Sequence, residues 1–186
     1  GLQAAGQPSG VVFADFFEPP ILNDSGQVAF IARLSGGGVE PDVNNTGIWL
    51  ADRERLELVA VTDGAVPESG GTARFQALER PAMNPDGLLV FNSTLKGPAI
   101  SIDNNLAMWW GEAGALAQLA RKGEAPPGVQ PGVVFRSFLP PAINPTGEVC
   151  FAGLLAGNVN FTNWAGIWLG VPNQLETVAR AGDPAP

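Results

Sequence analysis

The feature that most constrains this sequence is an octapeptide that recurs about every 60 residues. It reads NDSGQVAF at 23–30, NPDGLLVF at 84–91 and NPTGEVCF at 144–151. A second segment recurs in the same phase, as NNTGIWL, NNLAMWW and NWAGIWL. Self-similarity at a fixed period is typical of repeat architectures. We therefore predict one repeat domain over 1–186, made of the approximate repeats 1–67, 68–127 and 128–186.

Each repeat is expected to contain four short strands. The first approaches the octapeptide, the octapeptide supplies a tight turn and the second strand, and GIWL-type and LETVAR-type segments form the third and fourth. The 24 glycines, 17 prolines and low charged fraction of 15% suit short strands with frequent reversals. No segment has a helical period. We predict an all-β fold of three four-stranded, β-propeller-like blades, with a stacked β-solenoid as the alternative.

The invariant positions of the octapeptide are expected to be structural. The asparagine side chain should hydrogen-bond the turn backbone, the glycine should take positive φ, and the phenylalanine should lie in a core strand. A ligand-binding role for the asparagines is the alternative. Tryptophans at one repeat position, 49, 109 and 168, are expected in the core. The motif positions are Asn23, Gly26, Phe30, Asn84, Gly87, Phe91, Asn144, Gly147 and Phe151.

The two ends of the chain also share the period. The chain ends in ARAGDPAP and begins with GLQAAGQPSGVVF, and the internal passage ARKGEAPPGVQPGVVF combines both. Three blades are fewer than the ~4 to 8 of closed propellers. We therefore expect another chain or further repeats to complete the sheets, with copies of the same chain joined head to tail. A closed ring, an open polymer and a fragment of a longer array all remain open.

The octapeptide resembles the repeat of a bacterial surface tandem-repeat family that is named for its N-x-x-G-x-x-A-F motif. The first copy matches at Asn23, Gly26, Ala29 and Phe30, whereas the others carry Val90 and Cys150 in place of the alanine. The NPDG turn before a strand is similar to blades of TolB-like propellers. The resemblance implies an extracellular or cell-surface protein, whose further partners would be a surface glycan or another envelope protein. It brings no catalytic residues.

Composition excludes several function classes. The chain has no histidine and no tyrosine, which removes Ser-His-Asp catalysis, Cys-His catalysis and histidine-ligated zinc. A net charge of −8 without any basic run excludes nucleic-acid binding. No apolar run reaches the ~20 residues of a membrane span. The single cysteine, Cys150, cannot form a disulfide within the chain and is expected to be a small buried residue.

Carboxylate chemistry and aromatic contacts are what remain for a ligand site. Trp110 and Trp164 depart from the repeat and are candidates for ligand contact. Asp42 and Asp103 lie in asparagine-rich loops and are candidate Ca²⁺ ligands, although turn formation also explains such loops; no other cofactor is expected. The leading prediction is a non-catalytic structural or interaction protein, and the alternative is a carbohydrate-binding or carbohydrate-processing propeller. Its candidate carboxylates are Asp15, Glu18, Glu79, Asp42 and Asp103.

Overall fold

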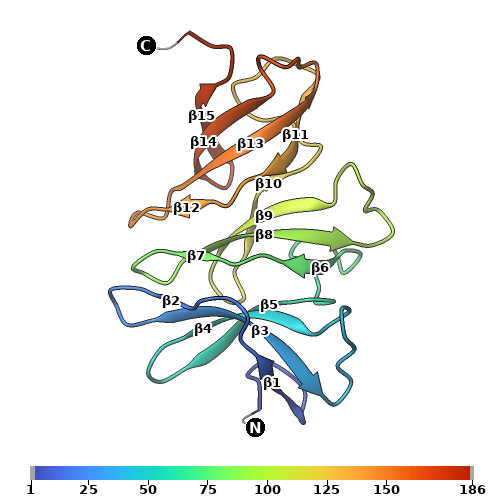
Figure 1. Ribbon diagram of the computed structural model, residues 1–186, viewed down its shortest axis with the longest axis vertical. Coiled ribbons are helices and arrows are strands. Elements are labelled where there is room, and N and C mark those ends of the chain that lie inside the picture. The colour runs from blue at the N-terminus through green and yellow to red at the C-terminus, as the bar shows by residue number, and fades with distance from the viewer. Residues whose placement is uncertain (1–2, 185–186) are drawn as a thin grey trace.

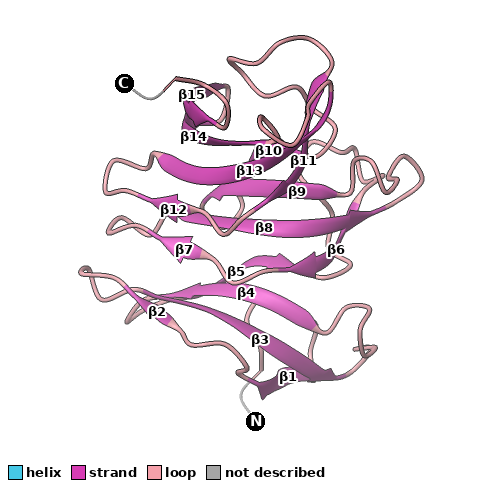
Figure 2. Ribbon diagram, turned by 45° about the horizontal axis from the view of Figure 1, so that its top comes forward, coloured by secondary structure: helices cyan, strands magenta, loops and turns pink. Residues whose placement is uncertain are grey.

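The structure, a computed structural model, describes residues 3–184 and contains only strands and loops in that range (Figures 1 and 2). Fifteen strands form three antiparallel sheets of five strands each. The prediction of an all-β fold with three repeated sheets is confirmed. Within this range the structure has no helix of the length and apolarity that a membrane crossing requires.

We call the three sheets blades 1, 2 and 3. Blade 1 contains β1 (Val11–Asp15), β2 (Ile21–Leu22), β3 (Val28–Gly36), β4 (Thr46–Ala51) and β5 (Leu56–Val61). Blade 2 contains β6 (Arg74–Leu78), β7 (Ala82–Met83), β8 (Leu89–Lys96), β9 (Leu106–Gly111) and β10 (Ala117–Arg121). Blade 3 contains β11 (Val133–Phe138), β12 (Ala142–Ile143), β13 (Val149–Gly157), β14 (Ala165–Val171) and β15 (Gln174–Arg180).

All three blades have the same topology. In blade 1 the order is β1-β3-β4-β5, and the short β2 pairs with the start of β3 while β1 pairs with its end. The sequence predicts a single strand before the octapeptide, but the structure divides this segment into two strands, β1 and β2 in blade 1. The interruption contains prolines in every blade, at 19–20, 81 and 140–141. Proline has no N–H to give to the ladder, so pairing stops there and resumes just before the turn.

The register also repeats, including its irregularities. The fourth strand of each blade carries one extra residue opposite the third strand, at Val59, Leu119 and Val178. A β-bulge of this kind bends its strand and increases the local twist. The same irregularity therefore recurs at the same place in all three sheets.

A tryptophan on the third strand forms the centre of each blade. Trp49, Trp109 and Trp168 are at most 2% exposed. Each ring packs edge-on against a phenylalanine of the first strand, with centroids 4.9 Å from Phe13, 5.5 Å from Phe75 and 4.9 Å from Phe135 respectively. The prediction that this tryptophan position packs the blade core is confirmed.

The blades stack in chain order, with blade 2 between blades 1 and 3, so the N- and C-terminal ends lie at opposite ends of the stack (Figure 1). One buried apolar cluster joins blade 1 to blade 2, and a second joins blade 2 to blade 3. The turns β2–β3, β7–β8 and β12–β13, which contain the octapeptide asparagines, lie along one edge of the stack (Figure 1). The comparison of the chain ends partly concerns residues 1–2 and 185–186, which are outside the described residues.

Candidate assembly interface

Each blade has a forward face toward the next blade and a backward face toward the preceding one. The forward face consists of alternate side chains of the second and third strands together with the bulge residue. In blade 1 these are Ala29, Ile31, Ile48, Leu50 and Val59, and their equivalents are Val90, Asn92, Met108, Trp110 and Leu119 in blade 2. In blade 3 they are Cys150, Ala152, Ile167, Leu169 and Val178.

The backward face consists of large apolar side chains of the first, short and second strands. In blade 2 these are Phe75, Leu78, Met83, Leu89 and Phe91, all of which pack in the cluster shared with blade 1. Their equivalents in blade 3 are Phe135, Phe138, Ile143, Val149 and Phe151, which pack in the cluster shared with blade 2. In blade 1 they are Phe13, Phe16, Leu22, Val28 and Phe30.

The forward face of blade 3 is apolar and exposed. Ile167 is 41% exposed, whereas Ile48 and Met108 at the equivalent positions are fully buried. Val178 is 58% exposed, compared with 8% for Val59 and 6% for Leu119. The difference arises because no further blade follows blade 3 within the described chain. The same side-chain types that bury a neighbouring blade in the interior are therefore open to solvent here.

The backward face of blade 1 shows the matching difference. Phe16 is 61% exposed, compared with 9% for Leu78 at the equivalent position. Leu22 is 72% exposed, whereas its equivalents Met83 and Ile143 are only partly exposed. Both ends of the stack thus present surfaces that are covered wherever a neighbouring blade exists.

Cys150 illustrates the effect at a single position. The equivalent residues Ala29 and Val90 are completely buried, but Cys150 is exposed. The prediction that Cys150 is a buried residue is therefore wrong. Its position on β13 is apolar in character in the other two repeats because a blade covers it there, and this cover is missing from blade 3 in the described chain.

The octapeptide asparagines stabilise their own turns through the side-chain oxygen. Oδ1 of Asn23 accepts the N–H of Gln27 at 2.8 Å, that of Asn84 accepts the N–H of Leu88 at 2.9 Å, and that of Asn144 accepts the N–H of Glu148 at 2.9 Å. The following glycines have φ values of 78°, 87° and 87° at Gly26, Gly87 and Gly147. These are the turn geometries that the octapeptide predicts.

The same asparagines also connect neighbouring blades, which the sequence did not reveal. Nδ2 of Asn23 donates to the carbonyls of Asn84 and Pro85 at 3.0 and 3.1 Å. Nδ2 of Asn84 donates to the carbonyl of Pro145 at 3.3 Å. We call this series, in which each asparagine binds the turn of the next blade, the asparagine ladder.

The turn glycines provide the space in which the preceding blade packs. A Cβ atom on Gly87 would lie 2.7 Å from Oε1 of Gln27, and one on Gly147 would lie 3.0 Å from Cδ1 of Leu88. Gly26 of blade 1 has no such neighbour, since no atom of the described chain beyond its adjoining residues lies within 4 Å of that position. The repeated glycine thus suits the positive φ of the turn, and at Gly87 and Gly147 it also leaves room for a side chain of the preceding blade.

The two candidate ligand-contact tryptophans lie in different environments. Trp110 is half-buried between blades 2 and 3, and its Nε1 donates to the carbonyl of Gly147 at 2.8 Å. Trp164 is 45% exposed on the loop between β13 and β14. The structure therefore does not bring the two rings together into one site: Trp110 joins two blades, and Trp164 lies beside the exposed Phe161 in sequence.

The asparagine-rich loops are organised by asparagine side chains rather than by the neighbouring acids. Asn44, Asn104 and Asn163 occupy one repeat position, and each accepts a backbone N–H of its own loop, at 2.7, 2.8 and 2.7 Å. Asp42 and Asp103 are exposed residues of these loops. Across residues 3–184, no three Asp, Glu, Cys or His side chains gather as a metal-binding group.

The candidate carboxylates do not gather into a group of three within residues 3–184. Glu79 accepts a hydrogen bond from Nδ2 of Asn92 at 3.1 Å. The pKa is lowered at two loop carboxyls: at Asp52 by the backbone N–H groups of Glu54 and Arg55, and at Asp63 chiefly by a hydrogen bond from Lys96. The first arrangement stabilises the β4–β5 turn, and the second connects a loop to the end of β8.

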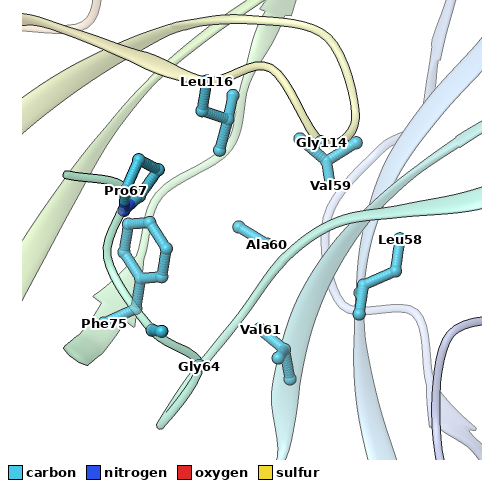
Figure 3. Close-up of a pocket in the computed structure, with 10 residues that line it drawn as sticks. Leu58, Val59, Ala60, Val61, Gly64, Pro67, Phe75, Gly114 and Leu116 are labelled. Carbon is cyan, nitrogen blue, oxygen red and sulfur yellow. The ribbon is translucent and has the colours of Figure 1, made fainter. Parts of the chain in front are cut away.

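An open cavity of about 340 Å³ lies beside β5, between blades 1 and 2 (Figure 3). Leu58, Pro67, Phe75 and Leu116 are among its lining side chains, and none of the ten lining residues is an acid, a base or a nucleophile. The cavity therefore offers apolar contact but no group that could carry out acid–base or nucleophilic chemistry.

Sequence reasoning did not single out the forward-face residues of β14. A signal for them existed, because Ile167, Trp168 and Leu169 are consecutive apolar residues. A strand with one buried face alternates between apolar and polar residues, whereas a continuous apolar run is typical of a strand buried on both faces. The run GIWL therefore indicates that this strand is covered from both sides.

The fold and these interfaces define the chain as an all-β tandem-repeat protein whose repeats pack face to face. The model of the family described as "Family of unknown function (DUF7453)" matches residues 3–186, and the chain belongs to that family. No curated protein matches the sequence closely enough to be counted as a relative.

Proposed function

We propose that the chain is a non-catalytic structural repeat module, located outside the cell or on its surface, that associates head to tail with copies of itself. The forward face of blade 3 in one copy packs on the backward face of blade 1 in the next. The observation that carries this proposal is the exposure of Ile167 at a position that is fully buried in both preceding blades.

The physical reason is the removal of apolar surface from water. Burial of such surface contributes roughly 25 cal/mol per Å². The proposal is supported by the two internal interfaces, in which equivalent forward and backward faces pack together. The contact joins two different surfaces, so it either closes into a ring or continues as a polymer. Two chains supply six blades, which falls within the range of ~4 to 8 of closed propellers. We therefore propose a closed ring of two chains.

The extracellular location is supported by the resemblance of the octapeptide to the repeats of bacterial surface proteins. A structural role is supported by the chemistry of the residues. The chain has no histidine and no tyrosine, which removes the catalytic arrangements that are built on those side chains.

The test is the mass of the purified chain as a function of concentration, measured by sedimentation equilibrium. We expect the wild type to reach twice the mass of one chain, and Ile167→Asp to remain monomeric at concentrations at least about tenfold higher. The matched control is Ile102→Asp, because Ile102 is 72% exposed on the loop between β8 and β9 and lies on neither face. The control should associate like the wild type.

A wild type that stays monomeric at every concentration would contradict the proposal, as would an Ile167→Asp variant that associates normally. Masses that increase without limit would retain head-to-tail contact but replace the ring with an open polymer. All three outcomes would be seen in the same sedimentation experiment.

Carbohydrate binding is a second candidate, supported by the two aromatic residues of the β13–β14 loop. Phe161 is 88% exposed and Trp164 is 45% exposed, and exposed aromatic rings can stack on sugar rings. The test is a glycan array with the wild type and with Trp164→Ala. Binding that is lost in the variant would support this candidate, and an array without any bound glycan would remove it.

A further inference from the structure

We infer that the asparagine ladder continues from one copy of the chain to the next, with Nδ2 of Asn144 donating to the backbone carbonyl of Asp24 in the second copy. This inference rests on the proposed head-to-tail association and identifies the polar contact that sets its register. Within the chain, each asparagine of the ladder donates to the turn of the following blade.

The acceptor follows from the equivalence of the three turns. Asn23 and Asn84 donate to the carbonyls of Pro85 and Pro145, which are the second residues of the next turns. Asp24 occupies this position in blade 1. Its carbonyl belongs to the backbone, so replacement of proline by aspartate leaves the acceptor in place.

The side-chain amide of Asn144 has a hydrogen left to donate to the next copy. Nδ2 of Asn144 donates to Oε2 of Glu148 at 2.8 Å within its own turn. Asn23 makes the same kind of contact with Oε1 of Gln27 at 2.8 Å and still reaches the next blade. Because an amide nitrogen carries two hydrogens, the bond to Glu148 leaves one for a neighbouring turn.

The space for this contact is also present. Gln27 and Leu88 each pack against the turn glycine of the next blade, and Glu148 is their equivalent in blade 3. Among the three octapeptide glycines, Gly26 of blade 1 is the one without such a neighbour in the described chain. In a head-to-tail contact the side chain of Glu148 would pack over Gly26 of the second copy.

The asparagine ladder also determines the relative orientation of two associating copies. The amide donors lie on the forward side of each turn, and the carbonyl acceptors lie on the backward side. Two forward faces brought together would oppose amide to amide and leave both without an acceptor, which carries a desolvation cost. The ladder therefore favours head-to-tail contact over head-to-head contact, in the manner of a specificity device.

The experiment compares two proteins that differ in one amide. Glu148→Gln serves as the reference, since it reproduces the Asn23–Gln27 arrangement and avoids a like-charge contact. The second protein carries Asn144→Asp in addition to Glu148→Gln. The new carboxylate still accepts the N–H of residue 148, but it cannot donate a hydrogen bond to the next copy. Sedimentation equilibrium should give a dissociation constant about tenfold weaker for the double variant. Thermal unfolding of the dilute monomers checks that the two fold equally well.

A second variant, Asn144→Ser, removes the same donor by a different substitution, so the result does not depend on the folding of one variant. Asn144→Ser in the wild-type chain retains a short acceptor for the turn and is too short to reach the neighbouring copy, so it should also weaken association about tenfold. Dissociation constants within twofold of their references for both variants would overturn the ladder inference.

The failure of this inference can be told apart from the failure of the proposed function. If Ile167→Asp abolishes association while both Asn144 variants associate normally, the head-to-tail contact stands and the ladder does not extend across it. If the wild type never associates, both are overturned.

Discussion

Asn84 uses both ends of its side-chain amide on backbone groups. Oδ1 accepts the N–H groups of Asp86 and Leu88, and Nδ2 donates across the interface to Pro145. The residue is 1% exposed, so water cannot replace these partners. A single side chain therefore stabilises a turn and the contact between two blades.

We predict that Asn84→Ala lowers the free energy of unfolding by about 2 kcal/mol or more, because the N–H groups of Asp86 and Leu88 lose their acceptor and the bond to Pro145 is removed. Asn144→Ala removes the acceptor of the Glu148 N–H and of the Thr146 hydroxyl. Asn144 is half-buried and has no following blade in the described chain, so this substitution should cost about 1 kcal/mol. The measurement is urea unfolding of both variants at a concentration where the wild type is monomeric. Equal losses would show that the contact with Pro145 adds nothing.

For individual residues, the sequence predicted the structural roles that depend on local geometry. The turn asparagines, the positive φ of the glycines and the core position of Trp49, Trp109 and Trp168 follow from residues close together in the chain. The exposure of Cys150 could not be predicted in this way. Burial at its position depends on whether another blade covers β13, which is a long-range property that one repeat does not encode.

The third strand of each blade adapts to its tryptophan in one of two ways. In blades 1 and 3 a glycine lies beneath the ring, where a Cβ on Gly47 or Gly166 would come within 2.5 or 2.7 Å of it. In blade 2 this residue is Ala107, and the indole N–H turns to Oγ of Ser93 at 2.8 Å. The position of Ser93 is occupied by Gly153 in blade 3.

We predict that Gly166→Ala destabilises blade 3 by about 1 to 3 kcal/mol through overpacking against Trp168. Gly153→Ser alone should also destabilise, since a Cβ there would lie 2.9 Å from the same ring. Together they reproduce the pair found in blade 2, so the ring can adopt the orientation of Trp109. The double variant should therefore lose less stability than the sum of the single variants.

A double-mutant cycle by chemical denaturation measures this coupling. Additive losses would mean that Trp168 does not reorient. Ala107→Gly in blade 2 is the matched control, because it removes a methyl group without any steric conflict. It should show no coupling to Gly153→Ser in the neighbouring blade 3, since Ala107 packs in the cluster shared with blade 1.

The strands themselves were predictable from the period, because the octapeptide and the GIWL-type segments mark the same elements in each repeat. The division of the first strand was not, although its cause is visible in the prolines that precede Ile21, Ala82 and Ala142. The bulges at Val59, Leu119 and Val178 were also missed. A one-residue bulge leaves the apolar pattern of a short strand almost unchanged, so it becomes visible only when the two strands are paired.

The whole molecule is a stack with two unlike ends. The forward face of blade 3 and the backward face of blade 1 are each half of an interface that occurs twice inside the chain. The number of stacked sheets was predictable from the number of repeats. The way in which the end faces are covered was not, because it depends on contacts beyond a single described chain.

We predict that association protects the thiol of Cys150 from a maleimide reagent. Cys150 is the only cysteine of the chain and lies exposed on the forward face of blade 3. Its labelling rate should fall as the protein concentration rises, and should remain constant for Ile167→Asp. Equal rates for the wild type at all concentrations, under conditions where its mass doubles, would place the contact on another face.

The repetition of one interface between successive blades has a consequence for how such a chain can change length. The two internal interfaces use the same strand positions, and the proposed head-to-tail contact would use them a third time. Duplication or deletion of one period would therefore insert or remove a whole sheet while leaving two compatible surfaces in contact. A gene encoding this fold can gain or lose repeats in single events, without new complementary surfaces having to evolve first.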